Sequence, residues 1–175
     1  VRGTGVVGIV ALDGDAVLLV EQHRPPVGCA VMELPAGLVG DEEGTRGESL
    51  QVAAERELLE ETGYRARAWR LLSDGPSSAG ISDERLHLWL ATDLERVGPG
   101  GGDASEAIVV HRVPVRNLHA FLRAARNRGV LVDPKVFLAA LVAGVGWDGE
   151  GWMPSPDPAA VRTPLRSVGL SLRTN

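Results

Sequence analysis

Short runs of apolar residues, many of them β-branched or alternating with polar residues, recur along the chain and predict β-strands. In residues 85–91, for example, Leu86, Leu88 and Leu90 would face one side of a strand. The strands expected on this basis are residues 6–12, 16–22, 68–72, 85–91 and 107–113. Asp13-Gly14-Asp15, between the first two runs, is typical of a hairpin turn.

Three other segments have apolar residues at helical spacing, and we expect helices at residues 49–62, 115–127 and 134–143. Gly63 is a favourable residue just past the end of the first helix, and Asp133 with Pro134 is a typical N-cap and first residue for the third. Strands and helices therefore alternate irregularly. This order favours an α/β protein of the α+β type, in which helices sandwich a mixed β-sheet, over a doubly wound parallel sheet.

Composition predicts one globular domain without a nucleic-acid surface. The 175 residues include 18 basic and 23 acidic side chains, for a net charge of −5. The arginines are scattered rather than clustered, so we expect no nucleic-acid polymer as a partner. An acidic protein that handles polyanions would need metal ions to mediate the contact.

The apolar segments are too short to predict a membrane span. The longest, residues 136–147, falls short of the roughly 20 residues that cross a bilayer, and no charged-then-apolar leader opens the sequence. Cys29 is the only cysteine, which favours a reducing compartment. We therefore expect a cytoplasmic protein with no membrane partner. Residues 1–146 should form the domain, and residues 147–175 an irregular tail that is disordered or wraps the partner subunit of a homodimer.

Three acidic residues on one predicted helix give the strongest chemical signal. Glu57, Glu60 and Glu61 stand at positions i, i+3 and i+4, so their carboxylates project from one face and repel each other. Arg56 can offset only one of these charges. Mg²⁺ held by carboxylates and substrate phosphate oxygens would relieve the remaining repulsion. The alternative is a solvated acidic face, but apolar residues along the same segment indicate that one side of this helix is buried.

The residues around these acids resemble the Nudix family. Its signature is a glycine, five residues, Glu, seven residues, and then Arg-Glu-apolar-x-Glu-Glu-x-Gly-apolar, and residues 48–64 match it from Glu48 onward. Ten residues rather than five separate Gly37 from Glu48. Either the loop contains a five-residue insertion or Gly37 is not the signature glycine. We favour the insertion, because Glu-Leu-Pro-Ala-Gly at 33–37, interpreted as a strand that runs into a glycine turn, resembles the start of this motif in ADP-ribose pyrophosphatases.

The resemblance implies a role for each acid in this motif. Glu57 and Glu61 would be the principal metal ligands, with Glu60 nearby and the Ala36 carbonyl as a further ligand. Glu48 would hold Arg56 and thereby orient the helix. The catalytic set implied in this way is Arg56, Glu57, Glu60, Glu61 and Glu106.

Residues outside the motif complete the implied site. Glu106 follows the glycine-rich residues 98–102, which we expect to form a mobile loop, and it resembles the further acid that this loop supplies to the metal and to catalysis in the family. The alternative is an exposed loop glutamate. Arg24, Glu33 and Glu84 are expected substrate contacts by resemblance to ADP-ribose-type members, with ordinary surface pairing as the alternative.

The resemblance implies a Nudix-like fold and Mg²⁺-dependent hydrolysis of the pyrophosphate bond in a nucleoside diphosphate derivative, such as ADP-ribose or another nucleoside diphosphate sugar. Mn²⁺ is the expected substitute for Mg²⁺. Metal ions would neutralise the phosphates and activate a water for in-line attack, and Glu57, Glu60 or Glu106 would take its proton. Two alternatives remain open: a pyrophosphatase that removes damaged nucleoside triphosphates, and a non-catalytic nucleotide-sugar sensor.

Overall fold

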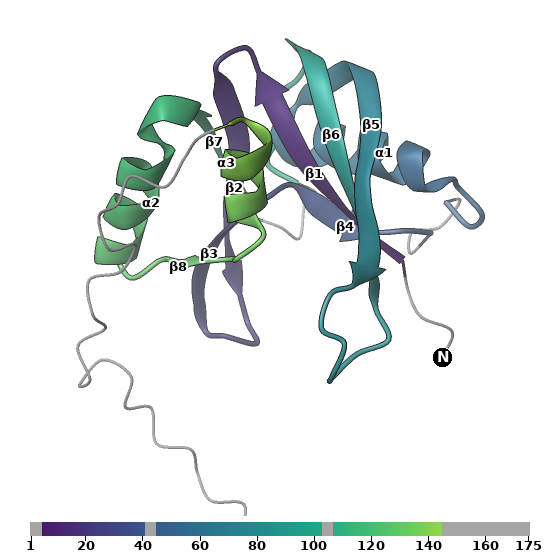
Figure 1. Ribbon diagram of the computed structural model, residues 1–175, viewed down its shortest axis with the longest axis horizontal. Coiled ribbons are helices and arrows are strands. Elements are labelled where there is room, and N and C mark those ends of the chain that lie inside the picture. Colours follow the sequence, from purple (N-terminus) through teal and green to yellow (C-terminus); the bar gives the residue numbers. More distant parts are fainter. Residues whose placement is uncertain (1–4, 41–44, 103–106, 145–175) are drawn as a thin grey trace, which may run out of the picture.

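The computed structural model describes residues 5–40, 45–102 and 107–144. In this part of the chain eight strands form a mixed sheet with helices on both of its sides (Figure 1). The strands are β1 (Gly5–Asp13), β2 (Ala16–Arg24), β3 (Cys29–Glu33), β4 (Ala36–Leu38), β5 (Tyr64–Pro76), β6 (Arg85–Arg96), β7 (Val109–Pro114) and β8 (Leu131–Val132). The helices are α1 (Leu50–Thr62), the 3₁₀ turn η1 (Val115–Asn117), α2 (Leu118–Asn127) and α3 (Val136–Val142).

The sheet has the strand order β5-β6-β1-β2-β3-β8, with β4 also paired to β1 and β7 to β2. The pairs β1–β6 and β3–β8 are parallel and the others are antiparallel, which confirms the predicted mixed sheet. β1 and β2 pair only next to their connecting turn, where Asp13 lies opposite Ala16. This pairing confirms the hairpin predicted at residues 13–15.

The interior strands are buried on both faces, which explains their nearly continuous apolar sequence. On β1, Val7, Ile9 and Ala11 pack with Leu58 of α1. Val10, on the opposite face, packs in a second cluster with residues of α2 and α3. The sheet therefore lies between helices, as predicted.

No helix in the described residues is long and apolar enough to span a membrane.

The helix that bears the three acids forms where its sequence predicts. Ser49 is its N-cap and accepts a hydrogen bond from the backbone N–H of Val52 at 3.3 Å. Gly63 ends it in the left-handed conformation, with φ 75°, and donates its N–H to the carbonyl of Leu59 at 2.8 Å. These local signals fix both ends of α1, and with them the spacing of its acidic side chains.

Two of the predicted helices differ from the observed ones. The segment 115–127 is not one helix, because η1 forms a separate turn before α2 begins. The third helix begins at Val136 with Lys135 as its N-cap, so the prediction that Asp133 and Pro134 begin it is wrong. The Asp133 carboxylate instead accepts a hydrogen bond from the backbone N–H of Lys135 at 2.7 Å, and this bond closes the turn before α3.

Three short strands had no clear signal in the sequence. β8 has two residues and β4 has three, too few to show an alternating pattern, and β3 has only five. The predicted glycine turn at residues 33–37 is wrong, because Gly37 lies within β4 and pairs with Val7 of β1. The five predicted strands are all present, four of them longer than expected and the last beginning at Val109.

Candidate active site

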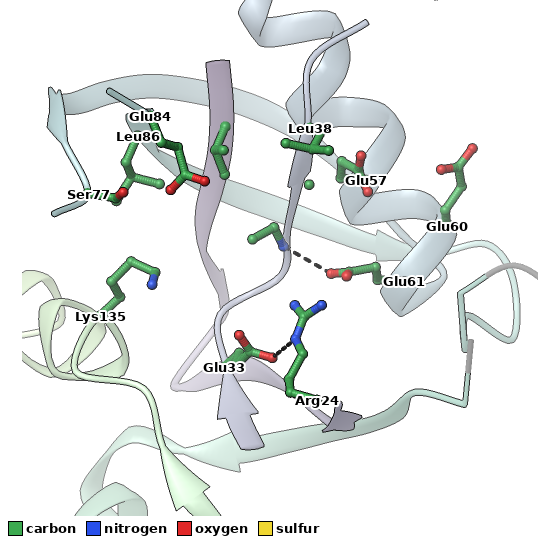
Figure 2. Close-up of a pocket in the computed structure, with 13 residues that line it drawn as sticks. Arg24, Glu33, Leu38, Glu57, Glu60, Glu61, Ser77, Glu84, Leu86 and Lys135 are labelled. Atoms are coloured by element: carbon green, nitrogen blue, oxygen red, sulfur yellow. Dashed lines mark hydrogen bonds and ion pairs between the residues drawn. The ribbon is translucent and has the colours of Figure 1, made fainter. Parts of the chain in front are cut away.

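The C-terminal half of α1 and the neighbouring strand β4 line one side of a pocket of about 410 Å³ (Figure 2). The pocket brings together most of the residues predicted from the sequence: Arg24, Glu33, Ala36, Glu57, Glu60, Glu61 and Glu84. Arg56 lies beside the pocket rather than in its lining, and Glu106 lies outside the described residues.

Two of the three predicted site acids on α1 are buried, one helical turn apart. Glu57 is 9% exposed and Glu61 only 3%, whereas the side chain of Glu60 is 42% exposed. A carboxylate is rarely buried unless charges or hydrogen-bond donors surround it. Glu57 and Glu61 are therefore not part of a solvated acidic surface, whereas Glu60 lies at the rim of the pocket.

The backbone of β4 contacts both buried carboxylates. The N–H of Ala36 donates a hydrogen bond to Oε2 of Glu61 at 3.0 Å, drawn in Figure 2. A Cβ atom added at Gly37 would overlap the carboxylate of Glu57. Only glycine therefore permits this close approach of helix and strand, which favours the assignment of Gly37 as the signature glycine. The predicted role of the Ala36 carbonyl as a metal ligand stays a prediction.

Arg56 links the helix to the segment that precedes it. One terminal nitrogen donates to Oε1 of Glu48 at 3.0 Å and to the carbonyl of Leu38 at 3.1 Å. The other donates to Glu57 at 2.9 Å and to Glu60 at 3.2 Å. The predicted contact between Glu48 and Arg56 is thus present, and it orients the guanidinium toward two of the acids.

This contact shifts the pKa of both partners. Burial alone would lower the pKa of the Arg56 guanidinium, but the hydrogen bond to Glu48 and the charges of Glu57 and Glu48 outweigh it and raise the pKa. The hydrogen bond from Arg56 holds the pKa of the Glu48 carboxyl below its ordinary value, against the effect of burial. The pair is therefore fully charged near neutral pH.

Glu48→Gln is expected to reduce the loss of stability in acid. Folding lowers the pKa of the Glu48 carboxyl. Its contribution to stability is therefore fully present at pH values above the ordinary pKa of a glutamate, and it is lost as the pH falls through the lower pKa of the folded state. Urea unfolding from pH 7 to pH 3 should show the wild type more stable at neutral pH and the two proteins converging at the acid end. A difference in unfolding free energy that stays constant from pH 7 to pH 3 would contradict a lowered pKa of Glu48.

The glycine-rich residues 98–102, predicted to form a mobile loop, lie against the end of α1. The N–H of Gly101 donates to the carbonyl of Glu61 at 2.8 Å, and that of Gly102 to the carbonyl of Glu60 at 3.1 Å. These bonds satisfy carbonyls that have no partner within the helix. The loop therefore fixes the turn of α1 from which two of the acids project.

Gly100→Ala should destabilise the protein by about 2 kcal/mol more than Gly14→Ala, measured by urea unfolding. Both glycines have positive φ, 69° and 60°, so the backbone strain of the two substitutions is matched. Only at Gly100 would the new Cβ overlap the backbone of Thr62, whereas nothing lies within 4 Å at Gly14. Equal losses of stability in the two variants would show that the loop does not support α1.

The other wall of the pocket contains residues from distant parts of the chain. Arg24 donates to Oε2 of Glu33 at 2.7 Å, and Glu84 lies near the start of β6. The sequence did not identify Ser77 and Lys135, which also line the pocket. The available signal for Lys135 is compositional, since it is the only lysine among 18 basic residues.

The donor set fits a hard divalent cation that shares its coordination with substrate. Within residues 5–40, 45–102 and 107–144, no three Asp, Glu, His or Cys side chains form a complete metal site. Glu57 and Glu61 supply buried oxygen donors, and the five carboxylates that line the pocket outnumber its two cations. A phosphorylated ligand could enter such an acidic pocket only with cations, and its own oxygens would complete their coordination.

Comparison with known proteins identifies the family. The model described as the NUDIX domain matches residues 2–133. This chain belongs to the Nudix family. The predicted resemblance to this family is therefore confirmed.

Nudix relatives with curated names are similar over much of the chain. An ADP-ribose pyrophosphatase of Mycobacterium tuberculosis is 41% identical over 54% of this chain and 44% of its own length. A GDP-mannose pyrophosphatase of Cronobacter sakazakii is 31% identical over 78% of this chain and 71% of its own length. The chain spans about half the length of the first curated relatives that it matches.

A solved structure confirms the fold. The crystal structure of an ADP compounds hydrolase superposes with a TM-score of 0.61, covering 81% of this chain and 70% of that one. The sequences are 23% identical, so this likeness is evidence of a shared Nudix fold.

Proposed function

We propose that this chain hydrolyses the pyrophosphate bond of a nucleoside diphosphate derivative, ADP-ribose or another nucleoside diphosphate sugar, with Mg²⁺ as cofactor and Mn²⁺ as an alternative. The observation that supports this most is the buried pair Glu57 and Glu61, held against the backbone of Ala36 and Gly37 in an acidic pocket. The names of an ADP-ribose and a GDP-mannose pyrophosphatase among the relatives support the same substrate class.

In this proposal Glu57 and Glu61 hold the cation, together with the Ala36 carbonyl and phosphate oxygens of the substrate. Glu60, at the exposed rim, is available for a further cation. When bound, the cation neutralises phosphate charge and lowers the pKa of an attacking water. Glu57, Glu60 or Glu106 accepts the proton of that water.

The arginine side chains in and beside the pocket have a different role from the acidic ones. Arg24 forms an ion pair with Glu33 at 2.7 Å, which fixes the guanidinium in the pocket lining. A fixed guanidinium matches the geometry of phosphate oxygens. We therefore place Arg24, Glu33 and Glu84 in substrate binding, while Arg56, held outside the lining, orients the acids of α1.

A substrate panel tests the proposed function. ADP-ribose, GDP-mannose, ATP and an oxidised nucleoside triphosphate would be incubated with Mg²⁺ and the products separated by chromatography. We expect the two nucleotide sugars to be cleaved to nucleoside monophosphate and sugar phosphate at least about tenfold faster than the triphosphates. Faster cleavage of the triphosphates would favour the sanitising pyrophosphatase, and tight binding of a nucleotide sugar without cleavage would favour the sensor.

Location and assembly are part of the proposal. We propose a cytoplasmic homodimer without membrane or nucleic-acid partners, in which residues 147–175 form a tail outside the catalytic domain of residues 1–146. The single cysteine and the scattered arginines support the first part. Sedimentation velocity of the full chain would show a dimer if the assembly is correct and a monomer if it is not.

A further inference from the structure

Three polar side chains form the wall of the pocket opposite α1, which we call the far wall (Ser77, Glu84 and Lys135). Ser77 and Glu84 lie at the two ends of the connection between β5 and β6, and Lys135 directly precedes α3. Figure 2 shows them across the pocket from Glu57 and Glu61. A substrate whose phosphates lie beside α1 would therefore place one of the two groups that flank them, the nucleoside or the sugar, against the far wall.

The far wall is held in place by short local contacts. The backbone N–H of Ser77 donates to the carbonyl of Glu84 at 3.2 Å, which closes the connection between the two strands. Nζ of Lys135 lies 2.7 Å from Oδ2 of Asp133, and the other oxygen of that carboxylate accepts the backbone N–H of Lys135 at 2.7 Å. An ammonium has three N–H donors, so Asp133 can fix its position and leave donors for a ligand.

The charges of the far wall indicate which chemical group it fits. It contains one ammonium, one carboxylate and one hydroxyl. The ammonium of Lys135 is already paired with Asp133, and Glu84 adds a further negative charge to the wall. A further phosphate would be repelled by these carboxylates. A hydroxylated neutral group suits this wall better, because each hydroxyl donates to a carboxylate and accepts from an ammonium.

We propose that the far wall binds the sugar of a nucleoside diphosphate sugar, with Lys135 and Glu84 bonded to its hydroxyl groups. This assignment rests on the proposed function and makes it more specific, since it selects a sugar rather than the third phosphate of a nucleoside triphosphate. Lys135 is then a specificity residue, positioned by Asp133.

Two ligands that differ only beyond the second phosphate test the assignment. ADP-ribose has the sugar, and the methyl ester of ADP has a methyl group in its place. Dissociation constants for both would be measured by calorimetry with Ca²⁺, which binds oxygen ligands in looser geometry than Mg²⁺. Lys135→Met removes the ammonium, and Arg85→Met, which removes an exposed cation paired with Asp74 outside the pocket lining, is the control.

The wild type should bind ADP-ribose at least about tenfold more tightly than the methyl ester. Lys135→Met should lose about tenfold in affinity for ADP-ribose and less than about twofold for the methyl ester, with the control unchanged. Equal losses for both ligands would assign Lys135 to the part that they share, the phosphates or the nucleoside, and would overturn the proposal. The proposal would also be overturned if Lys135→Met lost no affinity for ADP-ribose. The same holds if the wild type did not prefer ADP-ribose to the methyl ester, or if it bound neither ligand.

Turnover separates this proposal from the proposed function. If the wild type shows the expected preference and Lys135→Met the expected loss, but no AMP is released from ADP-ribose with Mg²⁺, the hydrolysis fails and the sugar site stands. If AMP is released but Lys135→Met keeps full affinity for ADP-ribose, the hydrolysis stands and the sugar site fails.

Discussion

Glu61→Gln is expected to lower the turnover of ADP-ribose about 10²-fold or more while leaving the fold intact. The substitution removes a charge that the cation needs but keeps the shape of the side chain. The amide oxygen of glutamine can still accept the hydrogen bond that the N–H of Ala36 donates to Glu61 at 3.0 Å. Turnover would be measured at saturating Mg²⁺, and the fold checked by circular dichroism.

The matched control for this substitution is Glu55→Gln. Glu55 is exposed on the same helix, where it accepts a hydrogen bond from Gln51 at 2.9 Å, and it does not line the pocket. The same chemical change should there leave turnover within about twofold of the wild type. Near-normal turnover of Glu61→Gln would remove Glu61 from the metal site.

Gly37→Ala is expected to lower turnover by a similar factor, about 10²-fold, through a purely steric effect. The added methyl group would overlap the Glu57 carboxylate, which must then leave its position beside β4. The concentration of Mg²⁺ for half-maximal activity should rise as well, because a displaced ligand binds the cation less well. Both quantities come from one series of Mg²⁺ titrations.

Gly75→Ala provides the control for this second substitution. Gly75 lies in β5 with no atom within 4 Å of the new Cβ and no positive φ, so the change there tests only the loss of a glycine. We expect it to leave the Mg²⁺ titration unchanged. If Gly37→Ala behaves like Gly75→Ala, the contact between β4 and Glu57 has no part in catalysis.

The sequence predicts the acidic helix well because all of its signals are local. Ser49, Gly63 and the apolar spacing between them fix the ends of α1 and the relative positions of its acids. The family motif adds the partner of Arg56, since Glu48 and Arg56 lie close in sequence and meet as expected. The capping signals and the motif spacing both predict this helix, and the structure has it with the expected ends and the expected contact between Glu48 and Arg56.

The surroundings of the helix depend on contacts between distant segments, which no local pattern shows. The three-residue strand β4 forms because it pairs with β1, and only then can Ala36 donate to Glu61. Lys135 lines the pocket from the turn just before α3, which begins later than its capping signals indicate. The far wall likewise requires the β5–β6 connection to lie opposite α1, an arrangement set by the whole sheet.

The most direct test of the proposed catalysis is ³¹P NMR of ADP-ribose with the wild-type chain, recorded with Mg²⁺, after addition of EDTA, and after Mg²⁺ is restored in excess. We predict that the pyrophosphate signals give way to those of AMP and ribose 5-phosphate with Mg²⁺, that conversion stops in EDTA, and that it resumes when Mg²⁺ returns. Cleavage that continues in EDTA, or intact ADP-ribose throughout, would contradict a metal-dependent pyrophosphatase built on Glu57 and Glu61.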